Sequence, residues 1–140
     1  DIISLHVPYL PSTHHLINAE RLRLLKPTAL LVNTARGKVV DTKAISVALR
    51  EGRLGGVALD TFEGEEIWIE EEFLKRDDLA AITLKEAMES FSIMRSERAI
   101  LTPHNAFNTR EALERILVTS AENLKAYFCS NPQNVVSAAP

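Results

Sequence analysis

The stretch ALLVNTARGKVVDTKAISVALREGRLGGVALD, residues 29–60, decides the fold. A short apolar run opens it, apolar side chains at helical spacing follow, and a second short apolar run closes it. Asp41 is a favourable N-cap for the helical segment, and Gly52 suits the position just past its end. Strand, helix and strand with short connections predict parallel strands joined by a right-handed crossover. The expected elements are a strand over 29–33, a helix over 42–51 and a strand over 56–59.

The same alternation continues on both sides of this stretch. Residues 2–7 form an apolar, β-branched run bounded by Pro8, which predicts a buried parallel strand. Asn18 is a good N-cap for a short helix over 19–26, and residues 99–104 predict a fourth strand. The pattern therefore predicts an α/β fold, with a parallel sheet and flanking helices.

The C-terminal part of the chain predicts a long amphipathic helix. Asn108 and Glu111 form a capping-box-like pair before it, and Cys129 near its end is expected to be a packing residue rather than a nucleophile. Residues 73–98, upstream, are expected to contain one or two short helices. The apolar residues at helical spacing are Leu113, Ile116, Leu117, Leu124 and Phe128.

Composition narrows the possible partners and compartments. The net charge of −3 comes without a basic stripe, which argues against nucleic acid. No apolar run approaches ~20 residues, which argues against a membrane span. The single cysteine excludes an internal disulfide and suits a reducing compartment, so a cytoplasmic protein is expected. The chain opens at Asp1, inside an apparent strand and without a signal peptide, so we expect it to be part of a longer protein.

Chemically useful side chains follow three of the predicted strands. Ligands bind outside the carboxyl ends of parallel strands, and Arg36, Glu65 and His104 all follow such ends. A guanidinium suits a carboxylate in two-point contact, a histidine can give or take a proton, and a glutamate can hold its ring. Together they could bind a small acid and move a proton at its neighbouring carbon. With a hydride acceptor, that chemistry is the oxidation of a 2-hydroxy acid.

Each of these residues also has an ordinary structural interpretation. Arg36 can be a surface ion-pair member, His104 a solvated loop residue and Asp60 a turn cap. Glu65 lies in a glutamate-rich run, most of whose other members are expected to be solvated. The histidines at 14 and 15 are interpreted as surface residues. The glycine after Arg36 favours a functional site, since it indicates a close approach of the backbone to something else.

Three blocks of the sequence resemble the NAD-dependent D-isomer-specific 2-hydroxyacid dehydrogenases. They are DIISLHVPYLPSTHHLIN at 1–18, LVNTARGKVVDTKAISVALREGRLGGVALDTFEGE at 31–65 and ILTPHNAFNT at 100–109. The match is weakest between Ile67 and Arg98. Within the family, DTFEGE and TPHNAFNT look most like the D-lactate dehydrogenase branch. The resemblance implies a Rossmann-like nucleotide-binding domain, NAD as cofactor and a homodimer formed through that domain.

The resemblance also implies roles for individual residues. Arg36 matches the arginine that binds the substrate carboxylate, His104 the general acid, and Glu65 the carboxylate paired with that histidine. Asp60 matches a residue at the nicotinamide end of the cofactor. The positions that match cofactor-binding residues are Val7, Pro8, Thr13, Thr34, Ala35, Arg36 and Asp60.

One departure from the family limits what this chain is expected to do. The G-x-G-x-x-G turn that seats the pyrophosphate is absent, so residues 1–130 are interpreted as the C-terminal half of the cofactor domain. Residues 131–140 would lead toward a separate substrate domain. The chain alone is expected to be inactive and to expose a sheet edge. Two alternatives stay open, a non-catalytic corepressor-like dinucleotide-binding protein and a structural oligomerisation module.

Overall fold

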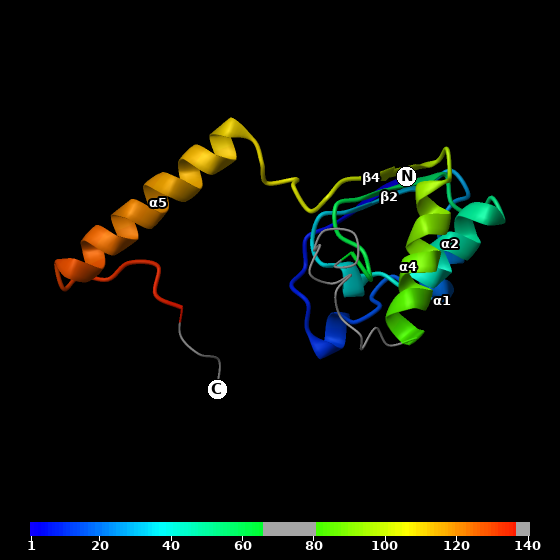
Figure 1. Cartoon of the computed structure of the whole chain (residues 1–140), viewed down its shortest axis with the longest axis horizontal. Helices are drawn as coiled ribbons and strands as arrows, with labels where there is room; N and C mark the ends of the chain where they lie inside the picture. The colour runs from blue at the N-terminus through cyan, green and yellow to red at the C-terminus, as the bar shows by residue number, and fades with distance from the viewer. Residues whose placement is uncertain (66–80, 137–140) are drawn as a thin grey trace. The chain divides into compact units, whose positions relative to one another are not determined.

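A parallel four-stranded sheet of order β1-β2-β3-β4 forms the centre of the first of two units, residues 1–105 (Figure 1). The computed structural model describes residues 1–65 and 81–136. Ile2, Leu30 and Gly56 stand side by side at the start of the first three strands, and Leu59 pairs with Leu101 at the other end. The predicted parallel α/β fold is confirmed. The strands are β1 (Ile2–Leu5), β2 (Leu30–Asn33), β3 (Gly56–Leu59) and β4 (Ala99–Leu101).

Three helices gather on one side of this sheet (Figure 1). Their apolar side chains form one core with the sheet, in which Leu31, Ile45 and Ile93 are almost completely buried. The opposite face of the sheet carries Ile2 and Ile100, both 67% exposed. The helices that the structure describes in residues 1–65 and 81–105 thus cover one face, whereas parallel sheets are usually covered on both. The helices are α1 (Ala19–Leu22), α2 (Thr42–Arg50) and α4 (Ala81–Met94).

The predicted helix caps hold for α1 and α2. Asn18 Oδ1 accepts from the backbone N–H of Arg21 at 3.0 Å, and Asp41 Oδ1 accepts from that of Ala44 at 2.9 Å. Gly52 follows α2 with φ +68°, a left-handed conformation that glycine adopts without steric cost. These three residues therefore fix where α1 and α2 begin and where α2 ends.

Five predicted elements are longer than the observed ones, the strand over 29–33 and the helix over 42–51 by a single residue and three others by more. The strand predicted over 2–7 ends at Leu5, because its partner β2 ends at Asn33. The helix predicted over 19–26 ends at Leu22, since the N–H groups of Leu24 and Leu25 bond three residues back instead of four. The strand predicted over 99–104 ends at Leu101, because His104 has φ +51° and turns the chain away. The prediction for 73–98 lies partly outside the described residues, and α4 is the helix observed there.

The second unit, residues 106–140, contains α5 (Arg110–Phe128). The predicted capping pair of Asn108 and Glu111 is wrong, because Thr109 is the N-cap and its Oγ1 accepts from Ala112 N–H at 3.2 Å. None of the α5 side chains is buried, and Cys129 at its end is exposed, so the predicted packing role of that cysteine is also wrong. Among the described residues, no helix combines the length and apolar character needed to cross a bilayer.

Candidate active site

The turn after β2 is built around Asn33, a completely buried amide that the sequence analysis missed. Its Oδ1 accepts from Ala35 N–H at 3.1 Å. Its Nδ2 donates to the carbonyl oxygens of Arg36 at 3.0 Å and Thr61 at 3.1 Å. Asn33 therefore fixes the backbone that carries Arg36 and ties it to the segment after β3. An amide at the end of a buried apolar strand was the available signal, because buried polar groups need partners.

Gly37 lies where two loops of the chain almost touch. A Cβ at this position would stand 2.5 Å from the carbonyl carbon and oxygen of Phe62. The predicted close approach is confirmed, and its partner is the backbone of the loop after β3. Arg36 itself is exposed, and its Nη1 donates to the carbonyl oxygen of Ala35 at 2.7 Å.

The loop after β3 brings Glu65 to His104. His104 Nδ1 lies 3.2 Å from Glu65 Oε1, and the other carboxylate oxygen accepts from Phe62 N–H at 3.1 Å. The Glu65 side chain is 15% exposed and that of His104 is 43% exposed. Gly64, with φ +77°, lets the chain turn between Phe62 and Glu65. A carboxylate only accepts hydrogen bonds, so this contact assigns the Nδ1 proton of the imidazole.

Asp60 holds the turn on which His104 sits. The aspartate is buried, and its Oδ1 accepts from Thr102 Oγ1 at 2.5 Å and from Asn105 N–H at 2.9 Å. The backbone N–H of His104 donates to the carbonyl oxygen of Asp60 at 3.0 Å. In this structure Asp60 orders the turn, as its turn-cap interpretation expected. Its contact with the cofactor stays a prediction.

A cleft of about 780 Å³ opens where these turns meet. Arg36 and Glu65 line it, and so do four of the predicted cofactor positions, Val7, Pro8, Thr34 and Ala35. Asp60, Thr13 and His104 are not among its lining residues. Thr13 closes the loop after β1, since its Oγ1 donates to the Pro8 carbonyl oxygen and accepts from Leu10 N–H, both at 2.8 Å.

Two residues interpreted as surface groups belong to this region as well. Glu63 lines the cleft, its side chain is only 10% exposed, and it pairs with His15 Nε2 at 2.7 Å. Glu63 is thus an exception to the solvated glutamates expected in this run, while the His15 side chain is 33% exposed, because the loop after β1 folds against the loop after β3. The histidine at position 14 is exposed, as expected, and stacks on His15 with ring centroids 3.9 Å apart.

The side chains that line the cleft suit a nucleotide cofactor. Apolar side chains from Val7, Pro8 and Ala35 can contact ring faces, and the hydroxyl of Thr34 offers a hydrogen bond. The described residues contain no group of three side chains placed to hold a metal ion. Arg36 supplies a cationic group at the same cleft, which suits an acidic ligand beside the cofactor.

Comparisons with known proteins agree with this geometry. The chain is 43% identical over 126 residues to a glyoxylate reductase of Thermofilum pendens, covering 90% of this chain and 31% of that protein. It is 39% identical over 125 residues to a D-specific alpha-keto acid dehydrogenase of Enterococcus faecium, covering 88% of this chain and 36% of that protein. The chain thus spans about a third of the length of these relatives.

Solved structures and a family model match the same family as these relatives. The chain superposes on D-lactate dehydrogenase from Aquifex aeolicus, complexed with NAD and lactic acid, with a TM-score of 0.79 and 40% identity, covering 94% of this chain and 38% of that one. The NAD-complexed D-isomer specific 2-hydroxyacid dehydrogenase of Lactobacillus delbrueckii ssp. bulgaricus gives 0.80 at 28% identity, covering 99% and 40%. The model of the D-isomer specific 2-hydroxyacid dehydrogenase NAD binding domain matches residues 1–106. The chain therefore belongs to the D-isomer-specific 2-hydroxyacid dehydrogenases and carries part of their NAD-binding domain.

Proposed function

We propose that the protein containing this chain transfers a hydride between NAD(H) and a 2-keto acid/D-2-hydroxy acid pair. The observation that carries the proposal is the pairing of His104 with Glu65 at 3.2 Å, with Glu65 on the wall of the cleft that Arg36 also lines. A carboxylate-binding cation and a carboxylate-paired imidazole are the two groups that this reaction requires of the protein.

The side chains divide the work between binding and proton transfer. Arg36 would hold the substrate carboxylate through its planar fork of donors and so orient the neighbouring carbonyl. Glu65 holds Nδ1 of His104, which leaves Nε2 as the nitrogen that gives its proton to the carbonyl oxygen. NAD, when bound, supplies the hydride acceptor or donor. Val7, Pro8, Thr34 and Ala35 would hold it along the cleft.

Pyruvate and D-lactate are the proposed substrate pair. The similarity to the D-lactate dehydrogenase of Aquifex aeolicus supports this choice, as does the DTFEGE segment at 60–65. A second candidate is glyoxylate, because several curated relatives of 38–43% identity are glyoxylate reductases. Both keto acids present a carboxylate beside a carbonyl, so Arg36 and His104 serve either one. They differ by a methyl group, which a pocket distinguishes by about 1–3 kcal/mol.

Turnover by the full-length protein tests the proposal. Loss of NADH absorbance is followed with pyruvate, with glyoxylate and without a keto acid, and NAD reduction is followed with D-lactate and L-lactate. We expect the highest kcat/KM with pyruvate and activity with the D-isomer alone. A higher kcat/KM with glyoxylate would replace the proposed substrate but keep the reaction. NADH binding without turnover of any 2-keto acid would instead support the corepressor-like alternative.

The 140-residue chain by itself is proposed to be inactive and self-associating. It spans about a third of its relatives, and side chains such as Ile2 and Ile100 leave an apolar face of the sheet exposed within the first unit. We propose that the full protein is a cytoplasmic homodimer, which the family resemblance and the single cysteine support. Light scattering during size-exclusion chromatography measures both assemblies, and a monomeric full-length protein would contradict the dimer.

A further inference from the structure

Glu63, two residues before Glu65, is held at three points by different parts of the chain. Its Oε1 accepts from His15 Nε2 at 2.7 Å, and its Oε2 accepts from the backbone N–H of Thr42, the first residue of α2, at 3.1 Å. Its carbonyl oxygen accepts from Ser90 Oγ in α4 at 2.9 Å. With its side chain 10% exposed, the carboxylate has both oxygens engaged and little room to move.

His15 extends this anchor to the loop that follows Arg36. Its backbone N–H donates to the carbonyl oxygen of Lys38 at 2.9 Å, and an isolated parallel bridge joins Ile17 to Val40. The His15–Glu63 pair therefore connects the loops after β1, β2 and β3. Those three loops carry the proposed cofactor-binding, carboxylate-binding and imidazole-pairing residues.

We infer that His15 and Glu63 are positioning residues that set the geometry of Glu65 against His104. The inference rests on the proposed function. Only Gly64 separates the anchored residue from Glu65, and consecutive Cα atoms are fixed about 3.8 Å apart, so a shift of Glu63 is transmitted to Glu65. Within its own loop, Glu65 bonds to the backbone of Phe62, whose N–H donates to Glu65 Oε2 at 3.1 Å and whose carbonyl oxygen accepts from Glu65 N–H at 3.3 Å. The His15 bond joins those from Thr42 N–H and Ser90 Oγ in tying Glu63 to other parts of the chain, and it is the bond that reaches Glu63 from the loop after β1.

Single variants of the full-length protein test the inference. His15→Ala removes one donor to Glu63 and leaves Glu65, Arg36 and His104 intact. We expect kcat for the keto acid to fall roughly 10–100-fold, the usual effect of a small misplacement of catalytic groups. The Kd for NADH, read from its fluorescence, is expected to change by less than about twofold. His15→Gln keeps a nitrogen donor near the Nε2 position and should restore most of the lost kcat.

The control is His14→Ala, which removes the ring stacked on His15 but no bond to Glu63. It is expected to keep the wild-type kcat. Glu63→Ala also removes the acceptor of Thr42 N–H, so its loss of kcat should be at least that of His15→Ala. The double variant should be no worse than Glu63→Ala, because the bond between the two residues is already absent in that single variant. If Glu63→Ala fails to fold, the three histidine variants decide the question.

The outcomes separate this inference from the proposed function. A folded His15→Ala variant with wild-type kcat and a lowered unfolding temperature would show a purely structural pair and overturn the inference. Equal losses in His15→Gln and His15→Ala would overturn it too, because the donor would then not matter. A wild-type protein without keto-acid turnover would reject the proposed function, and the inference with it.

Discussion

His104 Nδ1 lies 3.2 Å from Glu65 Oε1, although the two residues follow different strands of the sheet. A residue with backbone angles in the left-handed region positions each of them. Gly64, with φ +77°, precedes Glu65, and His104 itself has φ +51°. A non-glycine residue in that region is uncommon and persists where its surroundings hold it there. Bonds from the buried Asp60 hold the His104 turn, so the pairing depends on ordered backbone on both sides.

Replacement of either partner should lower turnover in the full-length protein, and by different amounts. His104→Ala removes the proposed proton donor, so kcat is expected to fall by roughly 10²–10⁴-fold. Glu65→Gln keeps an oxygen that can accept from Nδ1 but removes the negative charge, so a smaller loss is expected. Steady-state rates of NADH oxidation measure both, with Glu97→Gln on the exposed loop before β4 as the matched control. An unchanged rate in His104→Ala would contradict the general-acid role.

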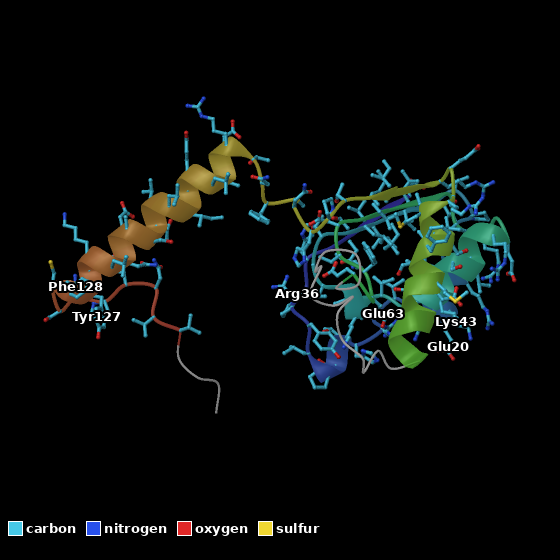
Figure 2. The ribbon with its side chains drawn as sticks, in the orientation of Figure 1. Glu20, Arg36, Lys43, Glu63, Tyr127 and Phe128 are labelled. Carbon is cyan, nitrogen blue, oxygen red and sulfur yellow. The ribbon has the colours of Figure 1, made fainter. Side chains whose placement is uncertain are left out.

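Arg36→Lys tests the two-point binding of the substrate carboxylate. Lysine keeps the positive charge but presents a single ammonium in place of a planar fork. We expect KM for the keto acid to rise and kcat to fall, because the carbonyl is no longer oriented. NADH affinity is measured by fluorescence titration on the same variant, because Arg36 is also one of the predicted cofactor-binding positions and a change in Kd has to be separated from the change in KM. Figure 2 shows Arg36 and Glu63 on the same α/β unit. A lysine variant with unchanged KM and kcat would place the substrate elsewhere.

Asp60→Ala should loosen the turn that carries His104. The variant removes the acceptor of two part-buried hydrogen bonds, from Thr102 Oγ1 and from Asn105 N–H, and leaves both donors without it. We expect a free energy of unfolding lower by about 1–3 kcal/mol and a kcat reduced with it. Asp60→Asn retains the Oδ1 acceptor and should lose less of both. Urea denaturation followed by circular dichroism, with rates on the same samples, gives both quantities. An equal loss in the Asn and Ala variants would show that the negative charge, and not the Oδ1 acceptor alone, is required.

Much of the fold could be predicted from the sequence because the signals are local. Asn18 and Asp41 cap helices through bonds to residues three positions on, and Gly52 ends α2 with a positive φ. The errors lie where contacts between segments decide. β1 stops at Leu5 because its neighbour β2 stops at Asn33. The N-cap of α5 is a separate, local error, since the hydroxyl of Thr109 and not the side-chain amide of Asn108 accepts from Ala112 N–H.

The sequence predicts only those site residues whose side chains have a recognisable chemical role. Arg36, Glu65 and His104 were candidates because a guanidinium, a carboxylate and an imidazole follow strand ends. The residues that support these three were not candidates, because their hydrogen-bond partners are distant in the chain. Glu63 meets His15 only after the loops after β1 and β3 fold together. Asn33 shows its role only when its amide reaches Thr61, the residue that follows Asp60 after β3.

Asn33→Ala should destabilise the protein more than an exposed asparagine substitution does. The buried amide makes three hydrogen bonds, and its loss leaves the Ala35 N–H and two carbonyl oxygens without that partner. The expected loss is about 1–3 kcal/mol in the free energy of unfolding. Asn108→Ala on the exposed segment before α5 is the control, and should change stability by less than about 0.5 kcal/mol. Equal midpoints in urea for the two variants would contradict the role of Asn33.

Gly37→Ala should disturb both stability and turnover, whereas Gly52→Ala should affect stability alone. A Cβ on Gly37 would stand 2.5 Å from the Phe62 carbonyl, so the loop that carries Glu65 has to move. Such overpacking costs about 1–3 kcal/mol, and the displaced Glu65 no longer holds His104 as before. At Gly52 the nearest atom to a new Cβ is an Arg98 side-chain nitrogen at 3.8 Å, so only the positive φ is strained, at about 1–2 kcal/mol.

The two glycine variants are therefore matched in chemistry and comparable in destabilisation but differ in distance from the cleft. Urea denaturation establishes the loss of stability in each, and NADH oxidation is measured under conditions in which both are fully folded. We expect a kcat reduced roughly tenfold or more in Gly37→Ala and unchanged in Gly52→Ala. If kcat follows stability in the same proportion for both variants, the contact between Gly37 and Phe62 has no specific part in placing Glu65.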